Sequence, residues 1–429
     1  MLIVGRIING LCVGICSAQV PVYISEISPP TRRGRLIGAQ QWAITWGIMI
    51  MFYISYGCSF IKGNAAWRVP WGLQMIPAII LFFGVFILPE SPRWLATKDR
   101  WEETREVLIL THGKGDPNSP WVHREYNEIK EWIQLEKEAS NVSYLELFRP
   151  RMINRTHIGL FTQIWSQLTG MNVMMYYITY VFTMAGLSGA SLLVSSSIQY
   201  VINVVMTVPA LIYMDRWGRR PTLLTGAALM ALWLFVNGAI LGGMGTYVPG
   251  GIEGKPEAKV SVTGAASKAV IACSYLFVAS YAPTWGPVSW TYPPELYPNR
   301  VRGKATALAT SGNWAFNFAL GYFVPPAFAN ITWRTYIIFG IFCVAMFVHV
   351  FFVFPETAGK PLEDITAMFE DPNGLHIGSI NMGTPAWKTK NYYSTAARME
   401  HGEGLEKRLS EDQSPERHEV AGEGRKADV

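Results

Sequence analysis

Carboxamide side chains lie inside segments of this sequence that are otherwise apolar, and they are the first residues whose types suggest chemistry. An amide in hydrocarbon is unfavourable unless it contacts a polar group on a neighbouring helix or lines a wet cavity. Amides both donate and accept hydrogen bonds, which suits a neutral ligand that carries several hydroxyl groups. For any single amide, hydrogen bonding between helices is an equal alternative to ligand binding, so the interpretation depends on the whole set. The set comprises Gln41, Gln163, Gln167, Asn172, Asn203, Asn313 and Asn317.

A second group of residues brings carboxylates and guanidinium groups to the ends of the apolar segments. Arginine presents a planar set of donors that can bind a carboxylate through two hydrogen bonds. Such pairs can hold two parts of a protein together in one state and release them in another, as in a gate. The alternative is ordinary positive charge on cytoplasmic links, which would need no matched carboxylates. The residues expected to form the cytoplasmic gate are Glu26, Arg33, Glu90, Arg93, Asp215, Arg219, Glu295, Arg302 and Glu356.

Nine apolar segments must position these side chains, and each is about 20 residues long, the length that crosses a bilayer core. Hydrophobic residues make up 50% of the 429 residues and charged residues only 16%, which excludes an ordinary soluble domain. The chain is therefore predicted to be an all-α polytopic membrane protein that lies in a lipid bilayer. The nine segments are residues 1–23, 37–60, 70–88, 157–184, 191–214, 221–243, 267–292, 304–329 and 335–354.

Two polar regions interrupt this pattern. Residues 90–152 show amphipathic helical spacing and are predicted to form a cytoplasmic helical insert. Residues 371–429 are polar and are expected to be a disordered cytoplasmic tail. Basic residues gather in the short links near Arg33, Arg219 and Arg302, which places these links in the cytoplasm. The formal charge of +5 therefore indicates membrane orientation, and we find no nucleic-acid footprint.

An internal repeat relates the beginning of the chain to its end. The repeated landmarks are Glu26, Pro29, Arg33 and Gly34 with Glu295, Pro298, Arg302 and Gly303, then Trp67 and Arg68 with Trp333 and Arg334, then Pro89 and Glu90 with Pro355 and Glu356. The repeat predicts two parallel helical halves, an N-terminal half at residues 1–89 and a C-terminal half at residues 153–370. By this count, three helices that would precede residue 1 are expected to be missing.

Seven motifs in a fixed order resemble the sugar porter family of the major facilitator superfamily, and fungal high-affinity glucose and hexose transporters in particular. They are GRIINGLCVGICSAQVPVYISEISPPTRRGRL, PESPRWL, QIWSQLTGMNVMMYY, DRWGRR, PPELYPNRVRG, NWAFNF and PETAGKPLEDI. The resemblance covers residues 1 to about 370. It implies the major facilitator fold with helices 4–12 present, movement of a monosaccharide by alternating access, and no enzymatic chemistry.

The resemblance also implies roles for individual residues. The amide set and Trp290 match positions that line the sugar site, where Trp290 would offer an apolar face to the sugar ring. Tyr177 and Tyr281 would close the cavity from outside, and the charged gate would latch the outward-facing state. The chain departs from the family at Ser166, where a pair of adjacent glutamines is usual, and this difference is expected to alter affinity or substrate choice.

The sequence leaves several alternatives open. The seven histidines and five cysteines show no metal-ligand spacing, so neither a metal site nor a cofactor is expected. The leading expectation is a plasma-membrane hexose carrier with glucose as its first candidate substrate. Proton symport and facilitated diffusion both remain open. A transporter-like sugar sensor that signals through its tail and a nonfunctional truncated product are the competing interpretations.

Overall fold

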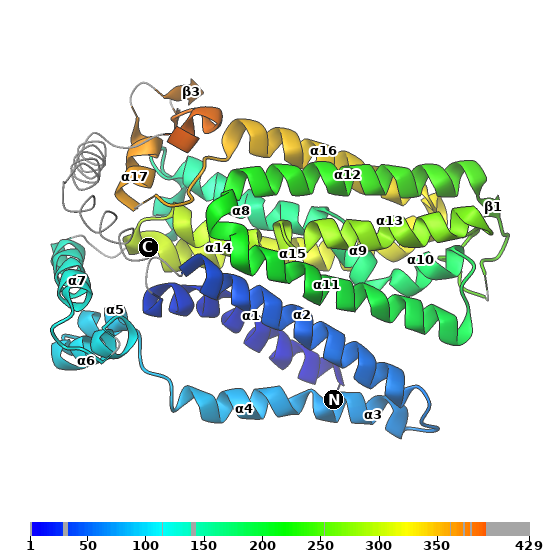
Figure 1. Ribbon diagram of the computed structural model, residues 1–429, viewed down its shortest axis with the longest axis horizontal. Coiled ribbons are helices and arrows are strands. Elements are labelled where there is room, and N and C mark those ends of the chain that lie inside the picture. Colours follow the sequence, from blue (N-terminus) through cyan, green and yellow to red (C-terminus); the bar gives the residue numbers. More distant parts are fainter. Residues whose placement is uncertain are drawn as a thin grey trace, which may run out of the picture.

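The computed structural model describes residues 2–391 apart from 29–32, 114, 139–142, 253, 361, 372–373 and 378–379. Within these residues, long helices run side by side along the longest axis of the molecule, and the short elements lie at its two ends (Figure 1). The strands that the structure describes form two hairpins of two strands each. The predicted all-α fold is therefore confirmed.

Every apolar segment predicted from the sequence is mainly helical where the structure describes it, with short interruptions and frayed ends. The N-terminal half contains α1 (Leu2–Ile27), α2 (Arg33–Cys58), α3 (Ala65–Leu73) and α4 (Met75–Val85). The C-terminal half contains α8 (Ile153–Leu168), α9 (Met171–Tyr176), α10 (Ile178–Met184), α11 (Gly189–Trp217), α12 (Arg219–Met244), α13 (Ala265–Tyr281), α14 (Trp285–Leu296), α15 (Asn299–Ile331) and α16 (Arg334–Val353).

The polarity of the spans shows where the interior of the bundle lies. Six spans in the described part of the chain are long and apolar enough to cross a membrane by length and composition: α1, α3 with α4, α11, α12, α13 with α14, and α16. Three predicted segments are not among these six apolar spans: those of α2, of α8 to α10, and of α15. Their helices carry most of the amide set. Because polar side chains are unfavourable against lipid, these three spans must face protein or water.

Besides the one-residue interruption at Gln74 between α3 and α4, two of the spans are broken near their middle. The break between α8 and α9 falls at Gly170, whose φ of 86° is a backbone conformation that favours glycine. The break between α13 and α14 contains Pro283, and Pro287 follows in the first turn of α14. Proline has no backbone N–H to donate, so a helix weakens there. Broken helices of this kind are tolerated in a membrane where they line a cavity or a buried site.

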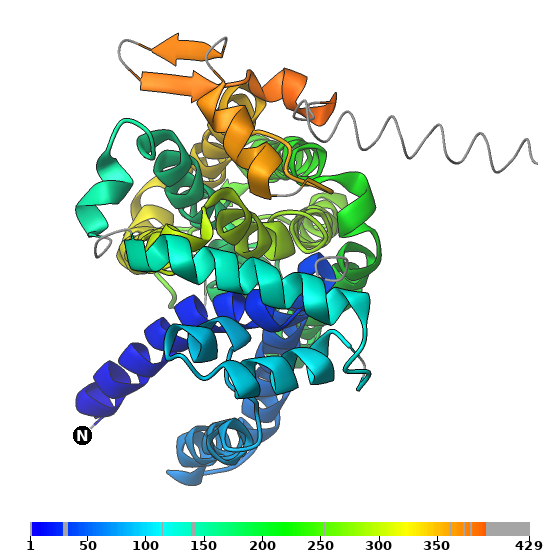
Figure 2. The same ribbon diagram turned by 90° about the vertical axis from the view of Figure 1, so that its left-hand side faces the viewer.

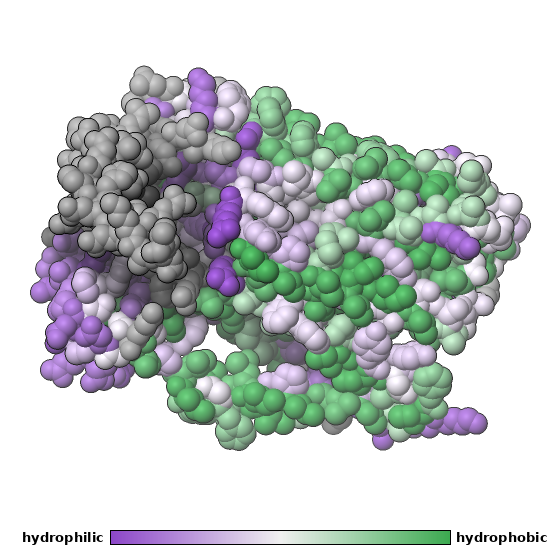
Figure 3. All heavy atoms as spheres, viewed as in Figure 1, coloured by the Kyte–Doolittle hydropathy of each residue, from purple (hydrophilic) through white to green (hydrophobic). Residues whose placement is uncertain are grey.

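The outer surface of the bundle is apolar. Green hydrophobic atoms cover the sides of the helices, whereas hydrophilic atoms gather at the end that carries α5 to α7 (Figure 3). The spans of the C-terminal half bury between 33% and 44% of their most apolar windows, and those of α1 and α3 with α4 bury 6%. The large buried cluster accordingly belongs mainly to the C-terminal half, with Phe182, Phe277, Phe328 and Phe339 among its members.

The two halves meet through α1 and α2. α2 packs against α11 and α14, and α1 packs mainly against α15. The Phe52 and Tyr200 rings lie 4.6 Å apart between α2 and α11. Between α15 and α1, Trp314 Nε1 donates to Ser17 Oγ at 3.0 Å. The region between these pairs is bounded by helices of both halves.

The insert between the halves forms α5 (Pro92–Thr97), α6 (Trp101–Thr111), α7 (Pro120–Glu138) and the short 3₁₀ helix η2 (Tyr144–Phe148). Its helices lie across the end of the bundle, as the end-on view shows (Figure 2). Leu108, Val122, Ile129 and Ile133 form a small core of their own there. The hairpin of β1 (Thr246–Tyr247) and β2 (Val260–Ser261) lies at the opposite end (Figure 1).

The C-terminal tail differs from the expectation of disorder. After α17 (Leu362–Glu370), the chain forms β3 (Leu375–Ile377), β4 (Ile380–Gly383) and the 3₁₀ helix η3 (Ala386–Asn391). The strands pair in antiparallel fashion, and η3 packs against α16. Polar composition predicted disorder for this segment. Composition alone does not show that a short polar segment can pack against helices that are already folded, as η3 does against α16. Residues 392–429 lie outside the described residues.

Candidate substrate site and cytoplasmic gate

A chain of amide hydrogen bonds joins α8 to α14 and α15. Gln163 Nε2 donates to the Ser289 carbonyl at 2.8 Å, and Asn313 Nδ2 donates to Gln163 Oε1 at 2.6 Å. Asn313 Oδ1 in turn accepts from Gln167 Nε2 at 2.8 Å. Gln163 and Asn313 are both buried. Each of these two amides uses its donor on one neighbour and its acceptor on another, so their orientations are fixed by the network.

The outer end of this chain is less buried. Gln167 Oε1 accepts from Asn317 Nδ2 at 3.3 Å and, through a shorter contact, from Asn172 Nδ2 on α9. All three of these side chains are half-buried. The 3.3 Å bond exceeds the usual N–H···O length of 2.7–3.2 Å. Because the inner amides hold Gln167 in place, the outer ones can exchange hydrogen bonds with a ligand without disturbing the buried part.

Two tyrosines flank the amide chain. The Tyr281 hydroxyl on α13 lies 3.2 Å from Ser166 Oγ. The Tyr177 hydroxyl donates to the Gly321 carbonyl on α15 at 3.3 Å, and the Tyr177 ring stacks on Tyr180 with their centroids 5.8 Å apart. Tyr177 thereby connects the junction of α9 and α10 to α15. The short side chain of Ser166 leaves room for the Tyr281 hydroxyl at this point.

The N-terminal half reaches the same region through Gln41. A β-carbon built on Gly286 would lie 3.4 Å from Gln41 Nε2 and 3.4 Å from Tyr281 Cε1. Gln41, Gly286 and Tyr281 are therefore neighbours, although Gln41 comes from α2 and the other two from the C-terminal half. The structure thus brings Gln41 of one half beside residues of the other.

Two predicted residues stand apart from the hydrogen-bonded set. Asn203 is buried on α11, and its backbone carbonyl accepts from Thr207 Oγ1 at 2.7 Å. Trp290 is half-buried on α14. The neighbouring Trp285 is fully buried and donates to the Leu223 carbonyl at 2.9 Å, so it has a structural role. The assignment of Asn203 and Trp290 to a ligand site stays a prediction.

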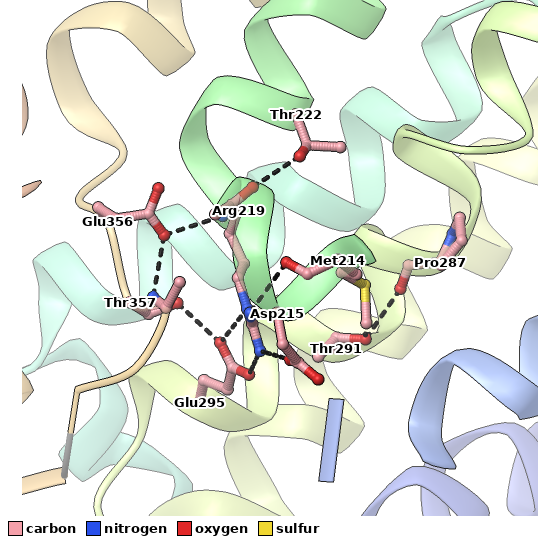
Figure 4. Close-up of polar contacts among 11 residues, drawn as sticks. Met214, Asp215, Arg219, Thr222, Pro287, Thr291, Glu295, Glu356 and Thr357 are labelled. Atoms are coloured by element: carbon pink, nitrogen blue, oxygen red, sulfur yellow. Dashed lines mark hydrogen bonds and ion pairs between the residues drawn. The ribbon is translucent and has the colours of Figure 1, made fainter. Parts of the chain in front are cut away.

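Arg219 is the centre of the charged cluster at the end of the bundle where α12 begins, the end expected to be cytoplasmic (Figure 4). Its Nη2 lies 2.7 Å from Glu295 Oε1 and its Nε 3.1 Å from Glu295 Oε2, so the pair is bidentate. The same Nη2 lies 3.1 Å from Asp215 Oδ1, and Nη1 donates to the Met214 carbonyl at 3.3 Å. Arg219 is only 4% exposed. A guanidinium group this far from water requires such partners.

Glu356 completes the cluster from the chain that follows α16. Its carboxylate accepts from the backbone N–H groups of Arg219 at 2.8 Å and Arg220 at 3.1 Å, which begin α12. A carboxylate at this position satisfies free donors and opposes the positive end of the helix dipole. A β-carbon on Gly218, whose φ is 85°, would lie 2.6 Å from Glu356 Oε2, so glycine is required there. The adjacent Thr357 Oγ1 donates to Glu295 Oε2 at 2.7 Å.

The cluster lies within the C-terminal half, whereas the sequence led us to expect ion pairs between the halves. The N-terminal half meets it through Gly34 at the start of α2. A β-carbon on Gly34 would lie 2.2 Å from Asp215 Oδ1 and 3.0 Å from Arg219 Nη2. The absence of a side chain therefore allows α2 to approach the charged cluster. Sequence spacing could not reveal this contact, since glycine carries no charge.

The remaining gate residues have separate partners. Glu26 accepts a short hydrogen bond from Ser91, as Glu295 does from Thr357, and Ser91 is the counterpart of Thr357 in the internal repeat. Arg93 Nη2 lies 3.4 Å from Glu125 Oε1 in the insert. Glu90 is exposed, and the buried Arg302 donates to the Tyr297 carbonyl at 3.3 Å. The Arg33 side chain lies outside the described residues. The repeat is thus visible in the structure as one shared hydrogen bond.

Known proteins match this chain over most of its length. A family model described as "Sugar (and other) transporter" matches residues 1–369. The chain is 49% identical over 407 residues to the "High-affinity glucose transporter" of Kluyveromyces lactis, covering 94% of this chain and 72% of that protein.

Solved structures of a second protein have the same fold. The proton:xylose symporter XylE bound to 6-bromo-6-deoxy-D-glucose is 28% identical, with a TM-score of 0.69 over 84% of this chain and 72% of that one. The inward open conformation of XylE from E. coli is 26% identical, with a TM-score of 0.56 over 81% and 68% of the two chains. The predicted major facilitator fold is therefore confirmed.

Replacing Arg219 by alanine is expected to destabilise the protein strongly. The Arg219→Ala variant leaves the Glu295 carboxylate without its cation, and loss of one partner of a buried ion pair costs about 3–5 kcal/mol. Arg124→Ala is the control, because the Arg124–Glu128 pair has side chains 72% and 56% exposed and such pairs contribute at most about 1 kcal/mol. Thermal unfolding of the purified variants in detergent measures both effects. Equal shifts in Tm would contradict this account.

A side chain at position 34 is expected to open the cytoplasmic end. Gly34→Val would place its β-carbon on Asp215 Oδ1, whereas Gly47→Val on the same helix meets nothing within 4 Å. A cysteine at the buried Thr291, in a background without the five native cysteines, reports accessibility to a water-soluble maleimide. We expect labelling at least about tenfold faster with Gly34→Val, equivalent to 1.4 kcal/mol, and unchanged with Gly47→Val. Similar rates for the two variants would disprove the proposed contact.

Proposed function

We propose that this chain, which belongs to the sugar transporter family, moves a hexose across a membrane by alternating access, with glucose as the first candidate. Membership of the family makes it a multi-pass membrane transport protein and not an enzyme. The choice of hexose is supported by the name of its Kluyveromyces lactis relative and by the glucose derivative bound to XylE. The observation that carries the proposal is the amide chain with one buried and one half-buried end.

The outer amides suit a sugar because each can donate and accept. Gln167, Asn172 and Asn317 present groups whose present hydrogen bonds are made with one another. A sugar hydroxyl also donates and accepts, so it can replace one amide partner without leaving another polar group unsatisfied. The buried Gln163 and Asn313 hold this surface in position. Little reorganisation is then needed on binding, which favours affinity.

Gln41 would make binding depend on the relative position of the two halves. Its amide lies beside Gly286 and Tyr281 of the C-terminal half. A ligand that contacts both Gln41 of the N-terminal half and Gln167 of the C-terminal half binds most tightly in the conformation that holds these two side chains at the right distance from each other. Such differential affinity is what allows a ligand to shift a conformational equilibrium. This is the requirement for a carrier that exposes its site alternately to each side.

The cytoplasmic end of this structure is closed around Arg219. Gly34 of the N-terminal half lies against the Asp215–Arg219 pair. In agreement with this, the chain is more similar to XylE with a bound sugar derivative than to inward open XylE, with TM-scores of 0.69 and 0.56. We therefore propose that the charged cluster stabilises the state that is closed to the cytoplasm. Inward opening would separate α2 from the cluster.

Protons are the candidate co-substrate, since the similar XylE is a proton:xylose symporter, and the plasma membrane is the proposed location. A protonophore distinguishes the two modes of transport. It abolishes the accumulation of sugar above the external concentration by a symporter, and it leaves equilibration by a facilitator unchanged.

Replacing Gln167 by alanine is expected to weaken sugar binding. The change removes one amide that serves a ligand and leaves Asn172 and Asn317 without their shared acceptor. We expect KM to rise about tenfold or more, since an unsatisfied buried group costs about 1–3 kcal/mol. Gln199→Ala is the control, because buried Gln199 bonds the Met174 carbonyl and should lower Tm without changing KM. Uptake of labelled glucose by cells that lack hexose carriers measures KM. An unchanged KM for Gln167→Ala would remove this residue from the site.

The Ser166 and Tyr281 hydroxyls are expected to act as one unit. Ser166→Ala and Tyr281→Phe each remove one end of the same 3.2 Å contact. Each variant should raise KM about three- to tenfold, the equivalent of one ordinary hydrogen bond. The double variant should be no worse than either single variant, because a shared interaction is lost only once. Uptake kinetics of the four proteins test this, and additive effects would show that the two hydroxyls act independently.

A further inference from the structure

The backbone of the gate residue Glu356 is held by a segment outside the part of the chain that the family model matches. That match ends at residue 369. Beyond it, the strap (residues 374–391 apart from 378–379) folds back against the cytoplasmic end of the C-terminal half (Figures 1 and 2). Within the strap, Thr389 Oγ1 accepts from the Glu356 N–H at 2.9 Å and donates to the Ala386 carbonyl at 2.7 Å.

The contact with Glu356 is buried. Thr389 is 0% exposed and Ala386 is 4% exposed. Trp387 packs edge-on against Phe352 near the end of α16, with ring centroids 6.1 Å apart. The Thr389 hydroxyl therefore fills a position that water does not reach. Its loss would leave the Glu356 N–H as a buried donor, which is unfavourable.

The strap is anchored independently at its other end. The Thr384 N–H donates to the Met368 carbonyl of α17 at 2.7 Å, and its hydroxyl donates to Asp371 Oδ2 at 2.8 Å. Gly383 has a φ of 75°, and a β-carbon there would lie 2.3 Å from Met368 O. Glycine is therefore needed for β4 to approach α17. These features show a fitted docking surface at each end of the strap.

We propose that Thr389 is a positioning residue for the cytoplasmic gate and that the strap holds the gate closed. This inference rests on the proposed transport function. Glu356 and Thr357 belong to one short connection after α16, and both contact the charged cluster. Glu356 caps α12, and Thr357 bonds Glu295, the main partner of Arg219. By holding the backbone of Glu356, Thr389 fixes both contacts and stabilises the state closed to the cytoplasm.

The proposal predicts a kinetic effect that a purely structural role would not produce. External sugar binds the state that is closed to the cytoplasm, so a smaller population of that state raises the apparent KM in proportion. Loss of one ordinary hydrogen bond changes such an equilibrium about fivefold. Thr389→Ala should therefore raise KM for external sugar, by up to about fivefold where the closed state is the minor one, with a smaller effect on kcat. Thr389→Ser keeps the hydroxyl and should restore the original KM.

The experiment compares Thr389→Ala, Thr389→Ser and Gly383→Val with the matched control Thr225→Ala. The exposed Thr225 bonds only carbonyls of its own helix, α12. Two measurements are made on the full chain: KM and kcat for glucose uptake, and the rate at which a cysteine at Thr291 reacts with a water-soluble maleimide in the absence of sugar. We expect faster labelling and higher KM for Thr389→Ala and Gly383→Val, and no change for Thr389→Ser or Thr225→Ala.

The two measurements separate the inference from the proposed function. If labelling is accelerated in Thr389→Ala and Gly383→Val but no variant, including the unaltered chain, takes up glucose, the strap acts on the gate and the substrate proposal fails. If the unaltered chain takes up glucose and both variants match it in KM and labelling rate, the strap does not position the gate. A lower Tm with unchanged KM and labelling would also overturn the inference, since it would show a role in stability alone.

Discussion

The bidentate pair between Arg219 and Glu295 is the interaction on which the charged cluster at the start of α12 depends. A guanidinium group that is only 4% exposed is unfavourable without paired carboxylates. This requirement explains why Asp215, Glu295 and Glu356 converge from three separate parts of the chain. It also explains the two glycines beside the cluster, because Gly34 and Gly218 allow other chain segments to approach the carboxylates closely. The charged cluster thus determines where α2, α12 and the end of α16 can lie.

The amide chain and the charged cluster are connected through α14. The carbonyl of Ser289 holds the buried end of the amide chain, and Glu295 lies about two helical turns further along the same helix. α14 begins after the break that contains Pro283 and is a separate helix from α13. In the proposed function, a ligand bound at Gln167 would act through the amide chain on this short helix, whose other end carries the main partner of Arg219.

The sequence predicted those features that depend on residue type. Amides inside apolar segments predicted the hydrogen-bonded set, and matched charges at segment ends predicted the Arg219 cluster. It could not predict the Ser289 carbonyl, because every residue has a carbonyl. It placed the ion pairs between the halves, because spacing does not reveal which helices meet. Gly34, which makes that contact, was a landmark of the internal repeat, but it has no side chain that could indicate its partner.

The tail shows a different limit. Its polar composition predicted disorder, yet Thr389 and Gly383 fit a surface that exists only once α16 and α17 have folded. The overall composition of a segment does not identify the single residues that make such contacts. Polar contacts of Thr389 with the Glu356 N–H and of Thr384 with Met368 and Asp371, together with packing of Trp387 on Phe352, hold this part of the chain in place.

Hexose transport through a site built from amides can be measured as uptake of labelled glucose into liposomes that contain the purified chain. We expect saturable uptake that unlabelled glucose inhibits and that exceeds uptake by liposomes without protein. Uptake equal to that of protein-free liposomes, from a preparation shown to be folded, would contradict it.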